Sequence, residues 1–186
     1  MTKFTVITDL HIGSAHQTMN SFYGTFQDNV IFLGDNFDFK GCLKKDIELL
    51  RLEFKELMRL NPDLPFLASN HEGEWGLPSI YKTGNTLFTH GHLCKKNSDK
   101  YIKDASTQWK GTNFFLWYLK GLVNKAIHMV GFQKDDALRA CELAKMHGCS
   151  AIVMGHYHLP KIYDENVNGV RVIVLPRGIT TIELGG

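Results

Sequence analysis

The chain has 186 residues, of which 44% are hydrophobic, and its formal net charge is +2. This length and hydrophobic content predict a single domain over residues 1–186 with one sizeable core, and two domains are not expected. The nearly neutral charge points to no particular class of partner. The four cysteines form no C-x-x-C pair and have no regular spacing, so the sequence indicates neither a zinc knuckle nor a disulfide framework, and a reducing cytoplasm fits best.

No segment has the features of a secretion signal or a membrane span. The stretch MTKFTVITDLH reaches a charged aspartate too early for the apolar core of a signal peptide. The longest uninterrupted apolar run, FFLWYL, is far shorter than the roughly 20 residues that cross a bilayer. We therefore expect a soluble cytoplasmic protein with no transmembrane segment.

Strands and a helix alternate in the first half of the chain. Residues 3–8 and 29–33 are short, rich in β-branched and aromatic residues, and followed by polar or glycine-containing turns, so strands are predicted there. Residues 43–62 carry apolar side chains at helical spacing up to Pro62, which predicts a helix.

The second half adds more strands and a last helix. Further strands are predicted at residues 64–69, 85–90, 151–154 and 169–176, and the terminal ELGG is typical of a strand end. A helix is predicted between Lys134 and His147, because two aspartates stand at its start and Gly148 follows its end. Helices between early strands, and late strands close together, favour an α/β domain with mixed sheets.

Side chains that can bind metal ions follow the predicted strands in five places. They are Asp9 and His11 in DLH, Asp35 and Asp38 in GDNFD, Asn70 and His71 in NHE, His90 and His92 in HGH, and His156 and His158 in GHYH. In α/β sheets, ligands gather where the carboxyl ends of strands converge. Oxygen and imidazole donors without a thiolate suit divalent manganese, iron or zinc, and these donors are too numerous for one ion.

The motifs D-x-H, G-D-x-x-D, N-H-E, H-G-H and G-H-x-H, in this order, resemble the signature of the calcineurin-like metallophosphoesterases over residues 9–158. The resemblance implies an α/β fold, a four-layer sandwich of two mixed β-sheets flanked by helices, with two divalent metal ions at one end. It implies one ion bound by Asp9, His11, Asp35 and His158, and a second bound by Asp35, Asn70, His90 and His156. Manganese is the expected metal, and zinc or iron would fit the same donors.

The chemistry expected of this donor set is ester hydrolysis. Two ions about 3.5–4 Å apart acidify a shared water molecule and stabilise the charge that grows on phosphoryl oxygens. The sequence therefore predicts a phosphoesterase in which a metal-bridging hydroxide attacks a phosphodiester, a pyrophosphate or a phosphomonoester. His71 is the expected proton donor to the leaving group. The resemblance pairs such a histidine with Asp38, which would orient the ring and keep it protonated.

Within this superfamily, the stretches GDNFDF and THGHLC are more similar to UDP-2,3-diacylglucosamine hydrolases than to protein phosphatases. Protein phosphatases carry an arginine where this chain has Phe39. The hydrolases, in turn, carry an arginine where this chain has His71 and an aspartate where it has His92. A small phosphorylated or nucleotide-linked molecule is therefore the expected substrate, rather than a phosphoprotein.

The segment from residue 93 to 134 is the most informative about substrate. It contains eight lysines and two acids, so it concentrates positive charge that would attract anions. We predict a helical, lid-like insertion in which Lys95, Lys96 and Trp117, with His92 nearby, contact the substrate. His92 has an alternative role in supporting a metal ligand. Trp117 falls on the polar side of the predicted helix, where either another segment covers it or it forms part of an apolar, basic lid.

Two other functions are consistent with these features. Lysines with interleaved aromatic residues also suit single-stranded nucleic acid, so a metal-dependent nuclease is the first alternative. A non-catalytic scaffold is the second, because the superfamily includes a retromer subunit that serves chiefly in assembly. The complete set of candidate ligands together with His71 favours an enzyme, since a scaffold needs no proton donor. The sequence leaves the oligomeric state open.

Overall fold

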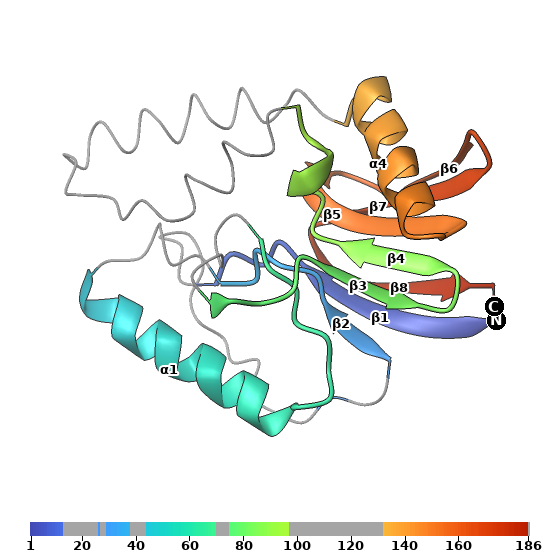
Figure 1. Ribbon diagram of the computed structural model, residues 1–186. Coiled ribbons are helices and arrows are strands. Elements are labelled where there is room, and N and C mark those ends of the chain that lie inside the picture. Colours follow the sequence, from blue (N-terminus) through green and yellow to red (C-terminus); the bar gives the residue numbers. More distant parts are fainter. Residues whose placement is uncertain (13–25, 27–28, 38–43, 70–74, 97–131, 186) are drawn as a thin grey trace, which may run out of the picture.

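A computed structural model of the protein describes residues 1–12, 26, 29–37, 44–69, 75–96 and 132–185. These residues form two β-sheets that face each other, with one helix packed on the outer side of each (Figure 1). The smaller sheet has the strand order β2-β1-β8, and the larger sheet has the order β3-β4-β5-β7-β6. Both sheets combine parallel and antiparallel pairs, which confirms the predicted sandwich of two mixed sheets flanked by helices.

The smaller sheet is built around β1 (Thr2–Thr8), which pairs in parallel with β2 (Val30–Phe32) and antiparallel with β8 (Gly178–Leu184). Successive side chains of a strand point to opposite faces, so β1 contributes to two cores. Val6 packs between the sheets, and Ile7 packs against helix α1 (Lys44–Leu60).

The larger sheet consists of β3 (Ile80–Thr83), β4 (Thr86–Thr89), β5 (Ala151–Leu159), β7 (Val170–Pro176) and β6 (Tyr163–Val167). Its three central strands, β4, β5 and β7, run parallel, and the two edge strands are antiparallel to their neighbours. A short 3-10 helix, η2 (His92–Cys94), follows β4, and α4 (Lys134–Met146) covers the outer face.

Three apolar layers hold these elements together. Phe88 and Val153 of the larger sheet meet the smaller sheet in the central layer, Phe54 of α1 fills the second, and Ala140 of α4 packs on Ile152 in the third. All five residues are almost fully buried. Burial of each large apolar side chain contributes about 1.5–3 kcal/mol, so the sheets form a firm base for the loops at their ends.

Most predicted elements are confirmed, and one predicted strand is wrong. The helices at 43–62 and 134–147 are α1 and α4, and the strands at 3–8, 29–33, 85–90, 151–154 and 169–176 are β1, β2, β4, β5 and β7. Residues 64–69 form only a single bridge, from Phe66 to Phe32, in a segment where Pro65 has no backbone N–H to donate. Strands β3 and β6 were not predicted, because their side chains are largely exposed and lack an apolar run.

None of the helices that the structure describes is both long and apolar enough to cross a membrane. Residues 97–131 lie outside the described part of the chain. The lid-like insertion and the role of Trp117 within it therefore stay predictions.

Candidate metal centre

The loops that follow β1 and β2 run side by side at one edge of the smaller sheet. The backbone N–H of Asp9 donates to Gly34 O at 3.0 Å, and the N–H of His11 donates to Asp35 O at 2.9 Å. Because β1 and β2 are parallel, both chains leave the sheet at the same edge. The pairing brings Asp9 and Asp35, from two separate motifs, into the same region.

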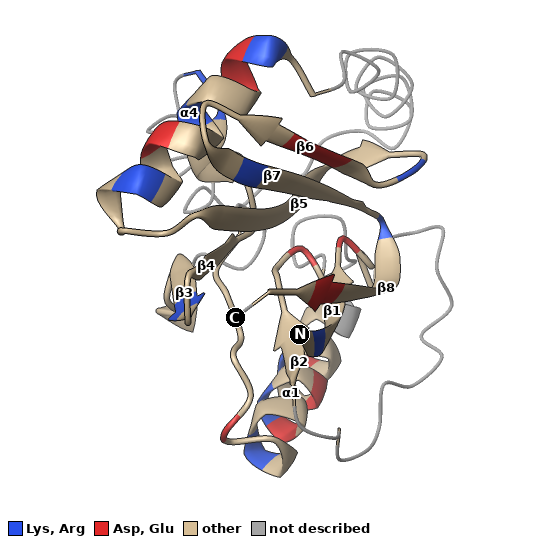
Figure 2. Ribbon diagram, turned by 90° about the vertical axis from the view of Figure 1, so that its right-hand side faces the viewer, with Lys and Arg blue, Asp and Glu red and all other residues tan. Residues whose placement is uncertain are grey.

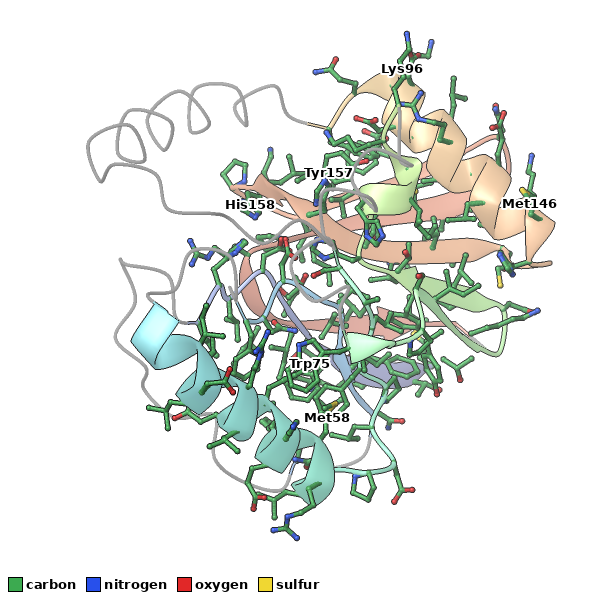
Figure 3. All side chains as sticks on the ribbon, turned by 60° about the vertical axis from the view of Figure 1, so that its left-hand side comes forward. Met58, Trp75, Lys96, Met146, Tyr157 and His158 are labelled. Atoms are coloured by element: carbon green, nitrogen blue, oxygen red, sulfur yellow. The ribbon has the colours of Figure 1, made fainter. Side chains whose placement is uncertain are left out.

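Strand β5 of the larger sheet reaches the same region. The backbone N–H of His156 donates to Asp9 Oδ2 at 2.9 Å, and the N–H of Gly155 donates to His90 O at 3.1 Å. The strand was expected to end at Met154. It continues to Leu159 instead, with an irregular register between these two residues. Figure 3 shows His158 at the end of β5 that is farther from Met146 of α4.

Asp9, His11 and His158 form the first group of candidate ligands. His158 Nε2 lies 3.0 Å from Asp9 Oδ1 and 3.3 Å from His11 Nε2. The rings of the two histidines meet edge to face, with centroids 5.2 Å apart. One donor atom from each residue lies within 4.8 Å of the other two, which is close enough to surround one cation.

Asp35, His90 and His156 form the second group. His90 Nε2 lies 3.2 Å from Asp35 Oδ2 and 3.2 Å from His156 Nδ1. Asp35 is 3% exposed and His90 is fully buried, so this group is less accessible than the first, in which the His158 side chain is 37% exposed. Its donor atoms also lie within 4.8 Å of one another.

Five of these six residues have a left-handed backbone. Their φ angles are 56° for Asp9, 52° for His11, 51° for Asp35, 74° for His156 and 48° for His158. Among the described residues, the other non-glycine positions with positive φ are Asn29 and Asn168. Asparagine, aspartate and histidine enter this region more readily than other residues with a side chain, although it still costs them energy. Such strain gathers at functional sites, where surrounding structure holds it in place.

Glycines allow the loops to approach this closely. A Cβ atom added to Gly155 would lie 2.5 Å from Asp9 Oδ2 and still nearer to Thr8 Oγ1. A Cβ on Gly34, whose φ is 103°, would lie 2.8 Å from Ser69 Cβ and 3.2 Å from His90 Cβ. Both glycines therefore stand where strands from different sheets meet, and neither position has room for a side chain.

Burial and neighbouring charges set the protonation of the candidate ligands. Burial alone would raise the pKa of Asp9, but the charge of His90 and the hydrogen bond with His158 outweigh burial and lower this pKa to about 2. Burial, reinforced by the charge of His90, holds the pKa of His156 well below its usual value. At neutral pH, Asp9 is thus a carboxylate and His156 a neutral imidazole, which are the forms that bind a cation.

This donor set fits two divalent cations. Asp9 and Asp35 are 1% and 3% exposed, and burying two carboxylates without positive partners would be unfavourable. In each group, ring nitrogens face each other at 3.2–3.3 Å, where lone pairs would repel unless a proton or a cation lay between them. Mixed imidazole and carboxylate donors suit manganese, iron or zinc, and the donors do not identify the metal.

His92, Lys95 and Lys96 lie beyond the two groups. His92 is 3% exposed, and its ring centroid lies 5.7 Å from that of His90. Both of its predicted roles, substrate contact and support of a metal ligand, stay predictions. Lys95 is half-buried, with its Nζ 4.3 Å from the centre of the Tyr157 ring and 3.8 Å from Asp136 Oδ2. Its charge contributes to the lowered pKa of His156. Lys96 is exposed.

Four other candidate site residues lie outside the described part of the chain. They are Asp38, Asn70, His71 and Trp117. The structure does describe Ser69, the residue before Asn70, which is buried beside Gly34. The predicted roles of the four residues stay predictions.

The structure adds two polar residues that the sequence did not indicate. The Thr8 hydroxyl donates to Asp9 Oδ2 at 2.6 Å and orients that carboxylate. Arg177, in the connection between β7 and β8, donates from Nη2 to Leu10 O at 2.9 Å. Neither residue belongs to a motif, and a lone threonine or arginine carries no signal in a single sequence.

The fold and the paired groups define a two-sheet α/β domain with the donors for two divalent cations at strand ends. The family model for the calcineurin-like phosphoesterases matches residues 2–160, and the chain belongs to this family. The resemblance seen in the five motifs is thereby confirmed at the level of the family. The narrower likeness to UDP-2,3-diacylglucosamine hydrolases is not confirmed.

Among solved structures, the chain is similar to Vps29 from Entamoeba histolytica. A single mutant of that protein has 13% sequence identity and a TM-score of 0.47, over 98% of this chain and 86% of that chain. A double mutant has 12% identity and a TM-score of 0.45, over 95% and 74% of the respective chains. The search of curated proteins finds no match.

Proposed function

We propose that this protein is a dinuclear metal-dependent phosphoesterase. The observation that carries the proposal is the convergence of Asp9, His11 and His158 in one group and Asp35, His90 and His156 in another. The two groups are close together, since the charge of Asp35 raises the pKa of Asp9. The charge of His90 and the hydrogen bond with His158 lower the same pKa more strongly. Membership of the calcineurin-like phosphoesterase family supports the same function.

In this proposal each group holds one divalent cation, with manganese as the first choice. Asp35 would also bind the first ion, and Asn70 would complete the ligands of the second. When bound, the two ions would supply positive charge for a phosphate ester and would acidify a bound water molecule. The buried carboxylates hold the ions, and the neutral imidazoles add affinity without cancelling their charge.

The remaining groups act on the substrate. His71 gives a proton to the leaving oxygen, and Asp38 orients its ring and keeps it protonated. Lys95 places a positive charge near the His156 side of the centre, where it favours an anionic substrate. We therefore propose a phosphodiester or nucleotide-linked molecule as substrate, with single-stranded nucleic acid as the alternative.

Hydrolysis of bis-p-nitrophenyl phosphate with added Mn²⁺ tests the proposal, with native protein compared against Asp35→Asn and His71→Ala. We expect Asp35→Asn to lose both Mn²⁺ binding and turnover. We expect His71→Ala to keep Mn²⁺ and to hydrolyse esters more slowly than native protein. The loss of rate should be larger for an alkyl ester, toward 10²- to 10⁴-fold, than for the p-nitrophenyl ester, because an alkoxide needs the proton more than p-nitrophenolate does.

Three results would contradict parts of this account. Equal turnover by all three proteins would refute the mechanism. No turnover by any of them, despite bound Mn²⁺, would favour a non-catalytic scaffold of the same fold. If single-stranded DNA were hydrolysed in preference to a nucleotide-linked lipid, the nuclease reading would replace the small-molecule substrate.

A further inference from the structure

Arg177 is the single residue between β7 and β8, where the chain crosses from the larger sheet to the smaller one. Strand β7 ends at Pro176 and β8 begins at Gly178. Figure 2 shows this crossing as a basic segment between the two strand labels. The connection is too short to move independently of the sheets, so the position of Arg177 is set by the strands on both sides.

The strand pairing places Arg177 next to the first group of candidate ligands. Pro176 pairs with Leu159, the residue after His158, and Gly178 pairs with Thr8, the residue before Asp9. The backbone of Arg177 is therefore fixed between the chain segments that carry two of the three donors in that group. Among the described residues, no other lies directly between a strand of one sheet and a strand of the other.

The side chain of Arg177 turns toward the same group. Its Nη2 donates to Leu10 O at 2.9 Å, and Leu10 lies between Asp9 and His11 in the chain. This contact uses one of five N–H donors, and a guanidinium presents the others in a rigid fork that matches phosphate oxygens. A tethered guanidinium also loses less side-chain freedom when it binds an anion.

Arg177 differs from the other arginines in its partners. Arg51, Arg59, Arg139 and Arg171 each form an ion pair with a carboxylate within 2.6–2.9 Å. Among the residues that the structure describes, no carboxylate pairs with Arg177, whose side chain is exposed. A strong cation held beside the centre without an acidic partner is suited to a negatively charged ligand.

From this geometry we infer that Arg177 is a substrate-binding residue that holds the phosphate group of the ester beside Asp9, His11 and His158. The inference rests on the proposed function, because it assigns the ligand of the same centre. It adds a contact from a part of the chain that contains none of the five motifs. A hydrogen bond from arginine to phosphate at a partly exposed site corresponds to about a tenfold change in affinity.

Binding of inorganic phosphate to the Mn²⁺-loaded protein, followed by phosphorus NMR relaxation, tests the inference without requiring turnover. We expect Arg177→Gln to weaken phosphate binding about tenfold and to leave the affinity for Mn²⁺ unchanged. Arg177→Lys should fall between native protein and Arg177→Gln, because an ammonium keeps the charge but loses the fork. Arg171→Gln, on the preceding strand β7 and away from the centre, is the matched control and should bind phosphate as native protein does.

Three outcomes of the binding experiment would overturn the inference. In the first, Arg177→Gln binds phosphate as tightly as native protein. In the second, it loses affinity for Mn²⁺ in parallel with affinity for phosphate, and the role of Arg177 would then be limited to its hydrogen bond with the Leu10 carbonyl. Native protein that binds no phosphate at all would also overturn the inference, and turnover would then decide whether the proposed function stands.

Turnover separates the two proposals. If phosphate binding depends on Arg177 and yet no ester is hydrolysed, the proposed function fails and the phosphate site stands. If esters are hydrolysed and Arg177→Gln changes neither KM nor the inhibition by phosphate, the function stands and the assignment of Arg177 fails.

Discussion

Replacing Gly155 by alanine would test the close contact between the two sheets. The new Cβ would lie 2.5 Å from Asp9 Oδ2 and nearer still to Thr8 Oγ1, well inside van der Waals contact. The backbone of Gly155 is not in the left-handed region, so the substitution introduces a steric conflict without backbone strain. Either β5 or the loop after β1 must move.

The size of the effect follows from the contacts that such a movement disturbs. Asp9 Oδ2 accepts hydrogen bonds from the Thr8 hydroxyl at 2.6 Å and from the backbone N–H of His156 at 2.9 Å. A hydrogen bond to a charged group contributes about 1.5–3 kcal/mol, and overpacking a filled site costs about 1–3 kcal/mol. If one of these bonds breaks, the free energy of unfolding should fall by about 3–5 kcal/mol.

Urea unfolding of the metal-free protein, followed by circular dichroism, measures this loss, and titration with Mn²⁺ shows whether the first ion is weakened. Gly185→Ala is the control, because a Cβ there meets nothing within 4 Å. Combining Gly155→Ala with Thr8→Ala removes the nearest clash and should recover part of the loss. A Gly155→Ala protein that matches the control in stability and in Mn²⁺ affinity would refute the reasoning.

Two further predictions concern buried titratable groups. Burial, with the charge of His90, lowers the pKa of His92 from 6.5 to about 4. The stability that the neutral ring provides is therefore complete above pH 6.5, the pKa of the unfolded chain, and is lost as the pH falls toward 4. The metal-free protein should lose up to about 3 kcal/mol in this range from His92 alone. Unfolding titrations of His92→Gln should show a flatter pH dependence, and an unchanged slope would contradict the assignment. Burial also raises the pKa of Cys94 to about 12, so this thiol should react with iodoacetamide near pH 8 only after the protein unfolds. Mass spectrometry measures the labelling, and rapid labelling of the native protein would show that the thiol is accessible.

The sequence predicted the parts of the fold that have a strong periodic signal. Helix α1 was found because its apolar side chains recur on one face, and β1 because it is a compact β-branched run. Strands β3 and β6 were missed because edge strands bury little and their side chains are mixed. The segment around Phe66 has strand-like composition, but its pairing with Phe32 is limited to one bridge.

The candidate site could be predicted from short motifs because each motif keeps its ligands close in sequence and its place at a strand end fixes where they meet. The family resemblance implied one ion bound by Asp9, His11, Asp35 and His158, and the structure brings Asp9, His11 and His158 together. The motifs could not indicate Thr8 or Arg177, whose contacts with Asp9 and Leu10 depend on strand pairing between distant segments. The left-handed backbone at the candidate ligands could not be predicted either, because no residue type at these positions requires a positive φ.

This backbone strain has an energetic consequence for the metal-free protein. A left-handed conformation costs up to roughly 1–2 kcal/mol for a residue with a side chain and less for aspartate. The five positions together therefore cost a sizeable share of a typical stability of about 5–15 kcal/mol. We expect ion binding to offset this cost, because the strained conformation is the one that directs the donors toward each other.

His158 is the position where this strain can be measured, because its φ is 48° and its side chain is 37% exposed. His158→Ala and His158→Gly both remove the ring and its contact with Asp9, so they differ mainly in backbone preference. At an ordinary position glycine would be about 0.5–1 kcal/mol less stable than alanine, owing to the entropy of the unfolded chain. Here we expect the reverse order in metal-free unfolding experiments, with glycine more stable by up to about 1 kcal/mol and both variants impaired in Mn²⁺ binding. If alanine were the more stable of the two, the left-handed backbone at the first group would store no strain, and the offset by ion binding would lose its basis.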